Sequence, residues 1–567
     1  MPIIQYSDCQ ILKGEHLVIT TIWARLWSMH DEVKEMFRFF VKPNDSEIIK
    51  KSQQNEVDDM DSKNREDDEE QKPQYAKMIG LILGPLFFIL ILSFFRPADL
   101  SWEGVAILAS TAWIATWWIT EAVPIPVTSL LPIVLFPLTK GLKVKSTASA
   151  YGDDVIFLFM GGFMIALAME KWNLHRRIAL SIIQLVGTNT ERIILGFMVA
   201  TGFLSMWISN TATAMMMVPI GLAISFQFAE ALRGHPDIDT REKHFPFGKA
   251  LMLSIAYSAS LGGIGTLIGT PPNALLAGAI DKIFGIEISF AQWMLFGVPF
   301  SWIFIIIVWL YLTKFAFRMP VKEIPGGREI IQKQKDELGK ASSEEKLVLT
   351  IFVLAALSWI TREFVLEKFI PEINDAIIAI IFGILLFIIP SPNNRGERLL
   401  DWDSAVKLPW GVLLLFGGGL AIAAGFVESG LSVWIGSQLS GLKGVSLILV
   451  IAIVVTIVAL LTEVTSNTAT ATMMFPIMAS LALALEVHPY ALMIAAALAA
   501  SCAFMMPVAT PPNAVVFGSG YLRIPDMVKA GIYLTLFGIL LITVFIYFWL
   551  PIAWGVDLHT VPEIFKQ

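Results

Sequence analysis

Residues 209–220 read SNTATAMMMVPI, and residues 466–477 read SNTATATMMFPI. The two stretches match at ten of twelve positions and lie 257 residues apart. Each places a Ser-Asn-Thr triplet inside a long apolar run, where polar side chains are costly unless they have partners or a function. The same polar bend therefore occurs twice, and we expect it to decide both the fold and the site.

Two further motifs show that the duplication extends beyond these bends. FMGGFMIA at residues 159–166 aligns with FGGGLAIA at residues 416–423 at the same offset. GTPPNA at residues 269–274 recurs as ATPPNA at residues 509–514, at an offset of 240. Three motif pairs in one order indicate a single duplicated unit.

The amino-acid composition places this duplicated unit in a membrane. Of 567 residues, 55% are hydrophobic and 16% are charged, whereas soluble domains carry about 25% charged residues. From residue 78 onward, apolar runs of about 17 to 25 residues follow one another, each long enough to cross a bilayer. The net charge of −7 argues against nucleic-acid binding, and Cys9 and Cys502 give no disulfide or metal-site pattern. We therefore expect an all-α polytopic membrane protein and not an enzyme.

The apolar runs predict helices in the same order in both halves of the chain. In the first half we expect helices at about 78–95, 104–120, 124–139, 154–175, 192–230 with a bend at Asn210, 248–282 and 292–317. In the second half we expect them at about 346–365, 374–390, 408–437, 445–485 with a bend at Asn467, 489–518 and 527–552. The expected divisions of the chain are an extension 1–72, a first transmembrane helix within 73–103, a first repeat 104–317, a basic connector 318–345, a second repeat 346–555 and a tail 556–567.

The extension differs in composition from the rest. Residues 55–72 carry nine acidic residues in eighteen positions and no aromatic residue, which is typical of a solvated tether. Residues 16–41 have roughly the spacing of an amphipathic helix. Binding to a membrane surface and ordinary packing on the protein body are equally compatible with that spacing.

The number of crossings decides how the two copies are oriented. If each bent pair is a re-entrant hairpin, five spans separate the two Ser-Asn-Thr triplets, and because five is odd the second copy is inverted. Inverted repeats are typical of secondary transporters, and tips entering from opposite faces can meet near the midplane. If the arms were full spans, the two tips would lie on opposite surfaces instead. Arm length does not decide between these alternatives, since each arm has about 15 to 18 residues.

Basic residues predict the orientation. The connector between 314 and 346 holds eight Lys or Arg residues, which places it in the cytoplasm. The amino terminus and residues 175–177 then lie inside as well, and the carboxyl terminus lies outside. Lys140, Lys143 and Lys145 fall outside and disagree with this rule.

The polar clusters at the bends suit small cations and anions. Ser205 and Ser209 are four residues apart, as are Thr462 and Ser466, so each pair lies on one helix face leading to a break. Hydroxyl, amide and freed carbonyl oxygens are hard ligands suited to Na⁺. Beyond the break, the free N–H groups of the next helix favour an anion.

The TPPN motifs predict two broken helices. Proline donates no backbone hydrogen bond and disfavours helix in the preceding residue, so Thr270 and Thr510 should lie in unwound segments. Such backbone is tolerated at membrane depth only within protein or beside a cavity. The glycine pairs at 161 and 418 fit helix packing better than ligand binding. Glu121, Glu463, Asp153 and Asp154 are interpreted as interfacial or supporting residues.

With SNTATAMMMVPI, TEVTSNTATATMMFPI, IGTPPNA and ATPPNA, the sequence resembles the divalent anion:sodium symporter family of di- and tricarboxylate transporters over about residues 78–555. The resemblance implies eleven membrane spans, two re-entrant hairpins, and a homodimer whose protomers each divide into a scaffold and a mobile transport domain. It implies Na⁺ ligands in two sets: Ser205, Ser209, Asn210 and the Gly269 carbonyl, and Thr462, Ser466, Asn467 and the Ala509 carbonyl. It implies substrate contacts from Asn210, Thr211, Thr270, Asn467, Thr468, Thr510 and Pro511.

The expected function is Na⁺-coupled uptake of C4 dicarboxylates such as succinate, malate or fumarate by an elevator movement in a cell or inner membrane. An Na⁺-independent dicarboxylate exchanger of the same family remains open. An anion channel would need a continuous polar pore, whereas the polar residues here concentrate at two points. A serine hydrolase would need a base near Ser209 or Ser466, and the surrounding spans contain no His or Lys.

Overall fold

Helices dominate this computed structural model, which describes residues 72–187, 189–233, 239–317, 327–439, 441 and 443–565. Those ranges contain no strand, apart from one bridged pair formed by Pro390 and Arg398. The prediction of an all-α membrane protein is confirmed. The expected amphipathic helix at 16–41 and the acidic linker at 55–72 lie outside the described residues.

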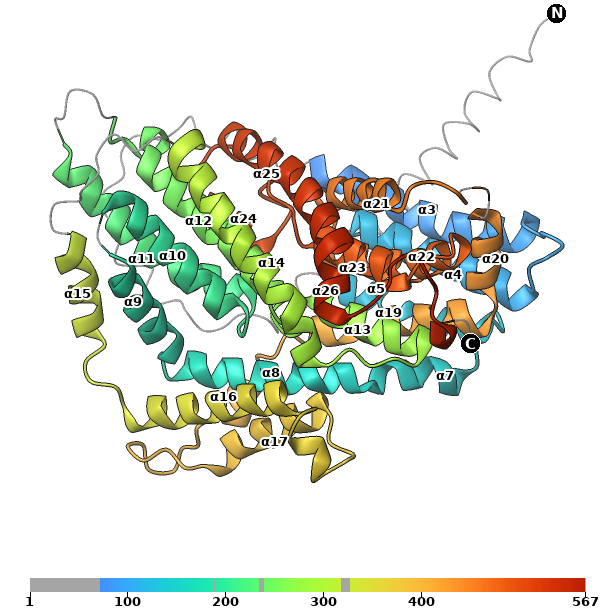
Figure 1. Ribbon diagram of the computed structural model, residues 1–567, viewed down its shortest axis with the longest axis horizontal. Coiled ribbons are helices and arrows are strands. Elements are labelled where there is room, and N and C mark those ends of the chain that lie inside the picture. The colour runs from blue at the N-terminus through green and yellow to red at the C-terminus, as the bar shows by residue number, and fades with distance from the viewer. Residues whose placement is uncertain are drawn as a thin grey trace, which may run out of the picture. The chain divides into compact units, whose positions relative to one another are not determined.

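The first half runs from α3 to α15 (Figure 1). Its first helices are α3 (Lys72–Phe94), α4 (Trp102–Thr120), α5 (Ile125–Thr128), α6 (Leu131–Leu138), α7 (Val144–Ser149), α8 (Asp154–Lys171) and α9 (Leu174–Val186). They are followed by α10 (Thr190–Ser205), α11 (Asn210–Ala231), α12 (Pro246–Gly263), α13 (Pro271–Phe284), α14 (Phe290–Leu310) with a π turn at Tyr311–Ala316, and α15 (Gly327–Glu337).

The second half repeats this order. It begins with α16 (Ser343–Thr361), α17 (Asp375–Ile388), α18 (Trp402–Ala405), α19 (Trp410–Glu428) and α20 (Leu431–Leu439). It continues with α21 (Leu447–Thr462), α22 (Asn467–Ala484), α23 (Pro489–Ala500), α24 (Pro511–Phe517), α25 (Ile524–Val544) with a π turn at Phe545–Trp549, and α26 (Leu550–Trp554).

Three expected helices are divided in the structure. The run predicted at 124–139 forms the short helices α5 and α6. The run predicted at 408–437 is two helices, because Gly430 adopts a left-handed φ of 74° between α19 and α20. The helix predicted at 154–175 ends at Lys171, and Asn173 with a φ of 54° starts the separate helix α9. Hydropathy missed the turn at Gly430 because apolar residues resume directly after it, and it missed α9 because the basic residues at 175–177 end the apolar run.

The predicted breaks occur where the motifs place them. Residues 206–209 separate α10 from α11, and residues 463–466 separate α21 from α22. The broken helices are α12/α13, unwound over 264–270, and α23/α24, unwound over 501–510. Both unwound segments end at the TPP sequence, as proline geometry requires.

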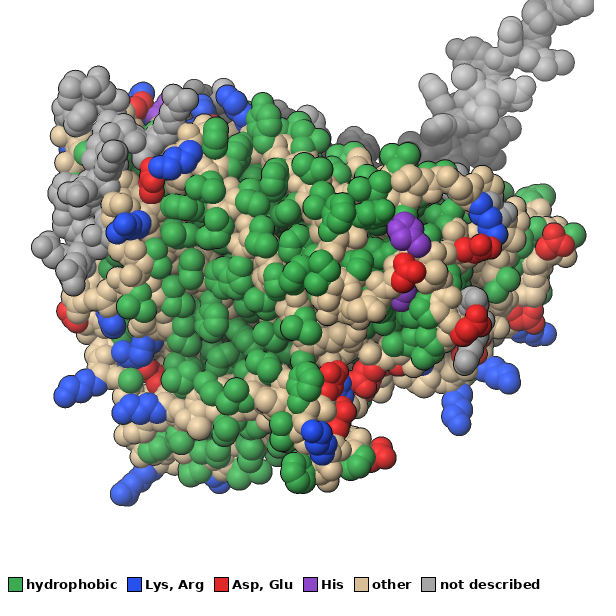
Figure 2. Space-filling view, viewed as in Figure 1, with side chains coloured by type: hydrophobic (Ala, Val, Ile, Leu, Met, Phe, Trp, Pro, Cys, Tyr) green, Lys and Arg blue, Asp and Glu red, His purple; other side chains and the backbone are tan. Residues whose placement is uncertain are grey.

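The outer surface fits a membrane environment. Seven helices in the described ranges are individually long and apolar enough to span a bilayer, and four shorter apolar helices accompany them. Hydrophobic side chains gather over the face crossed by α14 and α25 (Figure 2), including Leu295, Ile303, Leu536 and Leu540, which are all exposed. The total number of crossings stays a prediction, because hairpin arms and broken helices cannot be counted by length.

Glycines allow the closest helix contacts. A Cβ atom on Gly161 would lie 2.4 Å from the backbone of Ala379 in α17, and one on Gly418 would lie 2.6 Å from the Ser129 carbonyl oxygen. The duplicated glycine motif therefore serves helix packing, as expected. A Cβ atom on Gly262 would lie 2.3 Å from the Gly202 carbonyl oxygen, so α10 and α12 also meet backbone to backbone.

Candidate functional site

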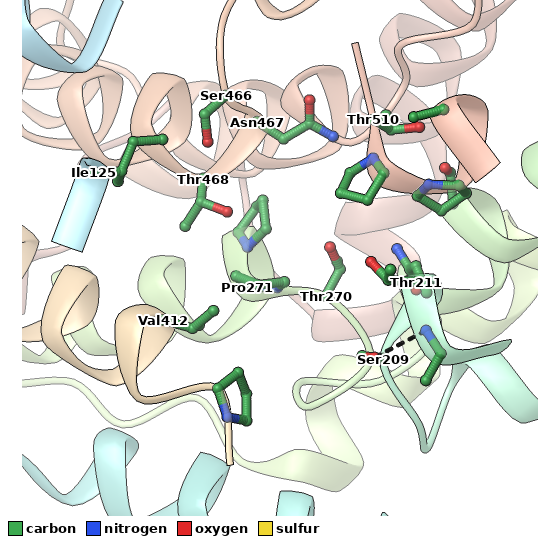
Figure 3. A pocket seen from close by; sticks show the side chains of 18 of the residues that line it. Ile125, Ser209, Thr211, Thr270, Pro271, Val412, Ser466, Asn467, Thr468 and Thr510 are labelled. Carbon is green, nitrogen blue, oxygen red and sulfur yellow. Dashed lines mark hydrogen bonds between the residues drawn. The ribbon is translucent and has the colours of Figure 1, made fainter. Parts of the chain in front are cut away.

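One cavity of about 950 Å³ brings the duplicated motifs together. Figure 3 shows Ser466, Asn467, Thr468 and Thr510 of the second half facing Ser209, Thr211, Thr270 and Pro271 of the first half. Ile125 and Val412 form a further, apolar part of the wall. The two tips are therefore near neighbours, which is the arrangement expected of re-entrant hairpins and not of full spans.

Several helices begin at this cavity. Asn210 starts α11, Pro271 starts α13, Asn467 starts α22 and Pro511 starts the short α24, and all four residues line the cavity wall. The first N–H groups of a helix have no partner within it and carry partial positive charge. A dianion in the cavity would thus meet helix amino-termini from both halves.

In the first half, a hydroxyl and an amide bridge the hairpin to the broken helix. Ser205 lies at the end of α10, is fully buried, and its hydroxyl donates to the Ala259 carbonyl oxygen at 2.7 Å. The same hydroxyl contacts the Asn210 side-chain oxygen. Ser209 accepts a hydrogen bond from the Ala212 N–H at 3.2 Å, which caps α11.

The second half repeats this arrangement. The hydroxyl of Thr462 donates to the Ala500 carbonyl oxygen at 2.9 Å and lies 2.7 Å from the Asn467 side-chain oxygen. Thr462 is fully buried, like Ser205. Ser466 directly precedes α22 but makes no capping bond with its side chain.

The first cluster is rich in oxygen atoms. One end of the Asn210 amide faces the carbonyl oxygens of Gly269 and Ala259 at 3.2 and 3.0 Å. The amide can meet these oxygens by turning its nitrogen toward them, or by sharing a cation with them through its oxygen. Gly263 leaves the space for this approach, since a Cβ atom there would lie 2.6 Å from the Asn210 oxygen and 2.9 Å from the Gly269 carbonyl oxygen. The donor set thus fits a small hard cation such as Na⁺.

Asparagines of the TPPN motifs hold the unwound segments. The Asn273 amide nitrogen donates to the carbonyl oxygens of Gly263, Ile264 and Thr266 at 3.3, 3.1 and 2.8 Å. The Asn513 amide nitrogen donates to those of Ala503 and Met506 at 3.3 and 3.0 Å. Both asparagines are fully buried. They replace the helical hydrogen bonds that these segments lack.

A buried carboxylate supports the second segment only. Glu463 follows α21 and accepts hydrogen bonds from the N–H groups of Phe504, Met505 and Met506 at 2.8 to 3.2 Å. The Thr535 hydroxyl of α25 donates to it at 3.3 Å. At the equivalent position of the first half, Met206 offers its backbone carbonyl to the Thr266 hydroxyl. Glu463 therefore fixes the shape of the segment that presents Ala509.

The structure brings the predicted site residues together in two layers. Those lining the cavity are Ser209, Asn210, Thr211, Gly269, Thr270, Ser466, Asn467, Thr468, Ala509, Thr510 and Pro511. Ser205 and Thr462 lie one layer behind and contact the asparagines. Sequence reasoning missed the roles of Asn273 and Asn513, although their place in a duplicated motif was a usable signal. It treated Glu463 only as a supporting residue without identifying its partners.

Charged residues occur only at the edge of the cavity lining. Lys77 lies near the start of α3, Glu121 follows α4, Glu170 lies at the end of α8, and Lys407 precedes α19. The predicted orientation assigns all four helix ends to the cytoplasmic side. No Lys or Arg among the described lining residues lies beside the asparagines and threonines of the tips.

Comparisons with known proteins find similarity over most of the chain. The family model of the sodium:sulfate symporter transmembrane region matches residues 75–555. The sodium-dependent dicarboxylate transporter SdcS of Staphylococcus aureus (strain bovine RF122 / ET3-1) is 53% identical over 487 residues, which cover 85% of this chain and 93% of that protein. Proteins of the same name from strains USA300 and COL match to the same extent.

Two solved structures resemble the fold. The YdaH transporter of Alcanivorax borkumensis superposes with a TM-score of 0.52 at 13% identity, covering 80% of this chain and 99% of that chain. MtrF of Neisseria gonorrhoeae superposes with a TM-score of 0.51 at 14% identity, covering 83% and 95%. At such identities the likeness concerns the fold alone.

Proposed function

This chain belongs to the divalent anion:sodium symporter family, and on that premise we propose that it imports C4 dicarboxylates such as succinate, malate and fumarate together with Na⁺. The relatives at 53% identity are named sodium-dependent dicarboxylate transporters, which supports both parts of the proposal. Members of this family are transporters, so the chain is a transporter and not an enzyme.

The observation that carries the proposal is the single cavity at which both hairpin tips and both broken helices meet. A dicarboxylate needs positive charge near both ends, and the amino-termini of α11 and α22 approach from opposite halves. The partial positive charges of these helix ends do not fully neutralise the two negative charges of a dicarboxylate. Bound Na⁺ would supply the rest and would make binding of the anion depend on the cation.

We assign two cation sites by their oxygen donors. The proposed ligands are, in the first half, Ser205, Ser209, Asn210 and the Gly269 carbonyl and, in the second half, Thr462, Ser466, Asn467 and the Ala509 carbonyl. Asn210 and Asn467 take part in both functions, because each starts a helix that faces the cavity and also contacts the hydroxyl behind it. The proposed substrate contacts are Asn210, Thr211, Thr270, Asn467, Thr468, Thr510 and Pro511.

Transport by an elevator movement fits the composition of the cavity wall. Motif residues line one part of it, whereas Ile125 and Val412, from α5 and α19, offer smooth apolar surface to the other part. A domain carrying the motifs could slide along such a surface without breaking polar contacts.

The cavity lining also contains four charged residues at helix ends that the predicted orientation places on the cytoplasmic side: Lys77, Glu121, Glu170 and Lys407. The described conformation would then be the one open to the cytoplasm, with the amino terminus inside. We propose a homodimer as the working assembly and the divisions at 72, 103, 317, 345 and 555 as its domain boundaries.

Radiolabelled succinate uptake into proteoliposomes tests the proposal. Uptake should require an inward Na⁺ gradient and should not require dicarboxylate inside the vesicles. Uptake that needs internal dicarboxylate and is indifferent to Na⁺ would identify an exchanger instead. Moving one charge through 100 mV is worth about 2.3 kcal/mol, so import aided by a negative interior requires more than two Na⁺ per dianion. We expect an electrogenic reaction, and a current-free uptake would contradict that stoichiometry.

A further inference from the structure

A groove on the outer face, which shares no lining residue with the transport cavity, has the graded polarity of a lipid. It lies between the end of α14 and the start of α25, which run side by side (Figure 1), and has a volume of about 590 Å³. The two helices are antiparallel here, because Phe304 contacts Phe537 while Tyr311, further along α14, contacts the earlier residue Tyr533. Figure 2 shows that hydrophobic side chains surround this region of the surface.

Residues along α25 change in polarity in steps of one helical turn. Lys529, Tyr533 and Phe537 are four residues apart, line the groove from one helix face, and are all exposed. The opposite wall of the groove contains Ile307 of α14 and Tyr311 of the π turn that follows α14. The groove is therefore apolar at depth, carries two phenol groups in the middle with ring centroids 6.4 Å apart, and ends at Lys529 with Asp526 beside it.

The cation at the end of the groove is available to an anion. Lys249 and Arg523 both pair with Asp526, at 2.9 and 3.1 Å. Lys529 forms no ion pair with any residue that the structure describes, whereas Asp526, which also lines the groove, is already paired with two other cations. Tyrosines and lysines at the end of a membrane-crossing helix are the groups that meet lipid headgroups.

We propose that this groove binds one anionic phospholipid, with its phosphate at Lys529, its glycerol region at Tyr311 and Tyr533, and an acyl chain along Ile307 and Phe537. The occupant is a lipid because the groove opens on the apolar surface of a membrane protein, where lipid is the surrounding solvent. A lipid here would support α25, whose Thr535 hydroxyl donates to Glu463 behind the transport cavity. The predicted orientation places the groove's polar end in the cytoplasmic leaflet.

Native mass spectrometry of the detergent-purified full chain tests this proposal, with phosphatidylglycerol or phosphatidylcholine added at equal concentration. Wild-type protein should retain phosphatidylglycerol more tightly than phosphatidylcholine. Lys529→Gln should weaken phosphatidylglycerol binding about fivefold, as expected for one lysine near an anionic headgroup, and leave phosphatidylcholine binding unchanged. Lys346→Gln is the matched control, because Lys346 is also exposed and unpaired among the described residues but lies outside the groove.

A second variant tests occupation of the groove itself. Ala530 is buried in the groove wall, and Ala530→Phe should fill the space and lower retention of both lipids. Phosphatidylglycerol should also raise the melting temperature of the wild-type protein more than that of Lys529→Gln. Equal binding of the two lipids by wild-type protein, or unchanged phosphatidylglycerol binding by Lys529→Gln, would overturn the proposal.

Discussion

In the first half the Ser205 hydroxyl donates to Ala259, and in the second half the Thr462 hydroxyl donates to Ala500. Each hydroxyl also contacts the asparagine that starts the next helix. The supports of these two clusters differ. In the second half Glu463 holds the unwound segment through three consecutive N–H groups, whereas the first segment depends on hydroxyl, amide and glycine contacts. Duplication thus kept the contacts between hydroxyl, asparagine and carbonyl while the surrounding structure diverged.

The largest expected effects come from the groups that the halves share. Asn210→Ala and Asn467→Ala should each abolish succinate uptake at Na⁺ concentrations that saturate the wild-type protein, because the apparent Na⁺ affinity falls by about 100-fold, the upper end for altered metal contacts. Each change removes an amide that reaches both proposed cation and substrate positions. Uptake into proteoliposomes across a range of Na⁺ concentrations measures this, with membrane expression as the control. Normal transport by either variant would refute that asparagine's assignment as a ligand.

A pair of changes at one repeat position separates the supports. Glu463→Gln should destabilise the protein by about 3 kcal/mol, because several buried N–H donors lose a charged acceptor. Met206→Leu should have little effect, since Met206 contributes only a backbone carbonyl to the corresponding contact. Thermal exposure of the buried Cys502 to a thiol-reactive dye, in a Cys9→Ser background, measures the difference. Equal melting temperatures for the two variants would show that both segments are supported alike.

The sequence predicted the parts of this comparison that depend on local chemistry. Proline at 271 and 511 and the Ser-Asn-Thr triplets located all four breaks, because each acts on its own backbone. Resemblance to a family assigned the ligand residues and implied the re-entrant hairpins, and the structure brings those residues to one cavity. A pattern of residue types was sufficient for these features because no distant partner had to be known.

Features that depend on distant partners could not be predicted in the same way. Glu463 bonds to residues about forty positions later, and nothing in its own neighbourhood identifies them. The same holds for Lys529, whose freedom from ion pairing follows from the pairing of Lys249 and Arg523 with Asp526. The separate helix α20 was missed because hydropathy registers apolar content and not a change of direction, and α9 was missed because its first turn carries basic residues.

The entrances of the two broken helices differ in their response to pH. Phe245 precedes α12 and contacts Phe228, whereas His488 precedes α23 and contacts Tyr490 and Phe565. Burial lowers the pKa of His488 to about 4, against a small opposing effect of Asp557. The folded protein therefore binds a proton less readily than the unfolded chain, whose histidine pKa is about 6.5.

Stability should thus be complete above pH 6.5 and should fall as the pH drops toward 4. Between pH 7.5 and pH 4.5 the loss from His488 should reach about 2 to 3 kcal/mol. His488→Phe, which makes the second entrance resemble the first, should remove this part of the pH dependence. Thermal unfolding followed by tryptophan fluorescence at the two pH values measures it. An unchanged pH dependence in His488→Phe would show that other groups are responsible.

The smallest expected effects distinguish two threonines at equivalent positions, Thr213 and Thr470. In the second half, the Thr470 hydroxyl lies 2.6 Å from the Thr465 hydroxyl. In the first half, Ile208 occupies the position equivalent to Thr465. The buried Thr213 hydroxyl therefore has no hydrogen-bond partner among the described residues. Thr470→Val should therefore cost about 1 kcal/mol, whereas Thr213→Val should be neutral or slightly stabilising, because it removes a polar group that is desolvated without compensation. The Thr465 hydroxyl still donates to the Leu461 carbonyl oxygen at 2.8 Å in Thr470→Val, so combining Thr465→Val with Thr470→Val should cost more stability than Thr470→Val alone. Melting temperatures of the wild-type protein, the two single variants and the double variant measure these differences. A destabilised Thr213→Val variant would mean that the Thr213 hydroxyl does have a hydrogen-bond partner, such as a bound water.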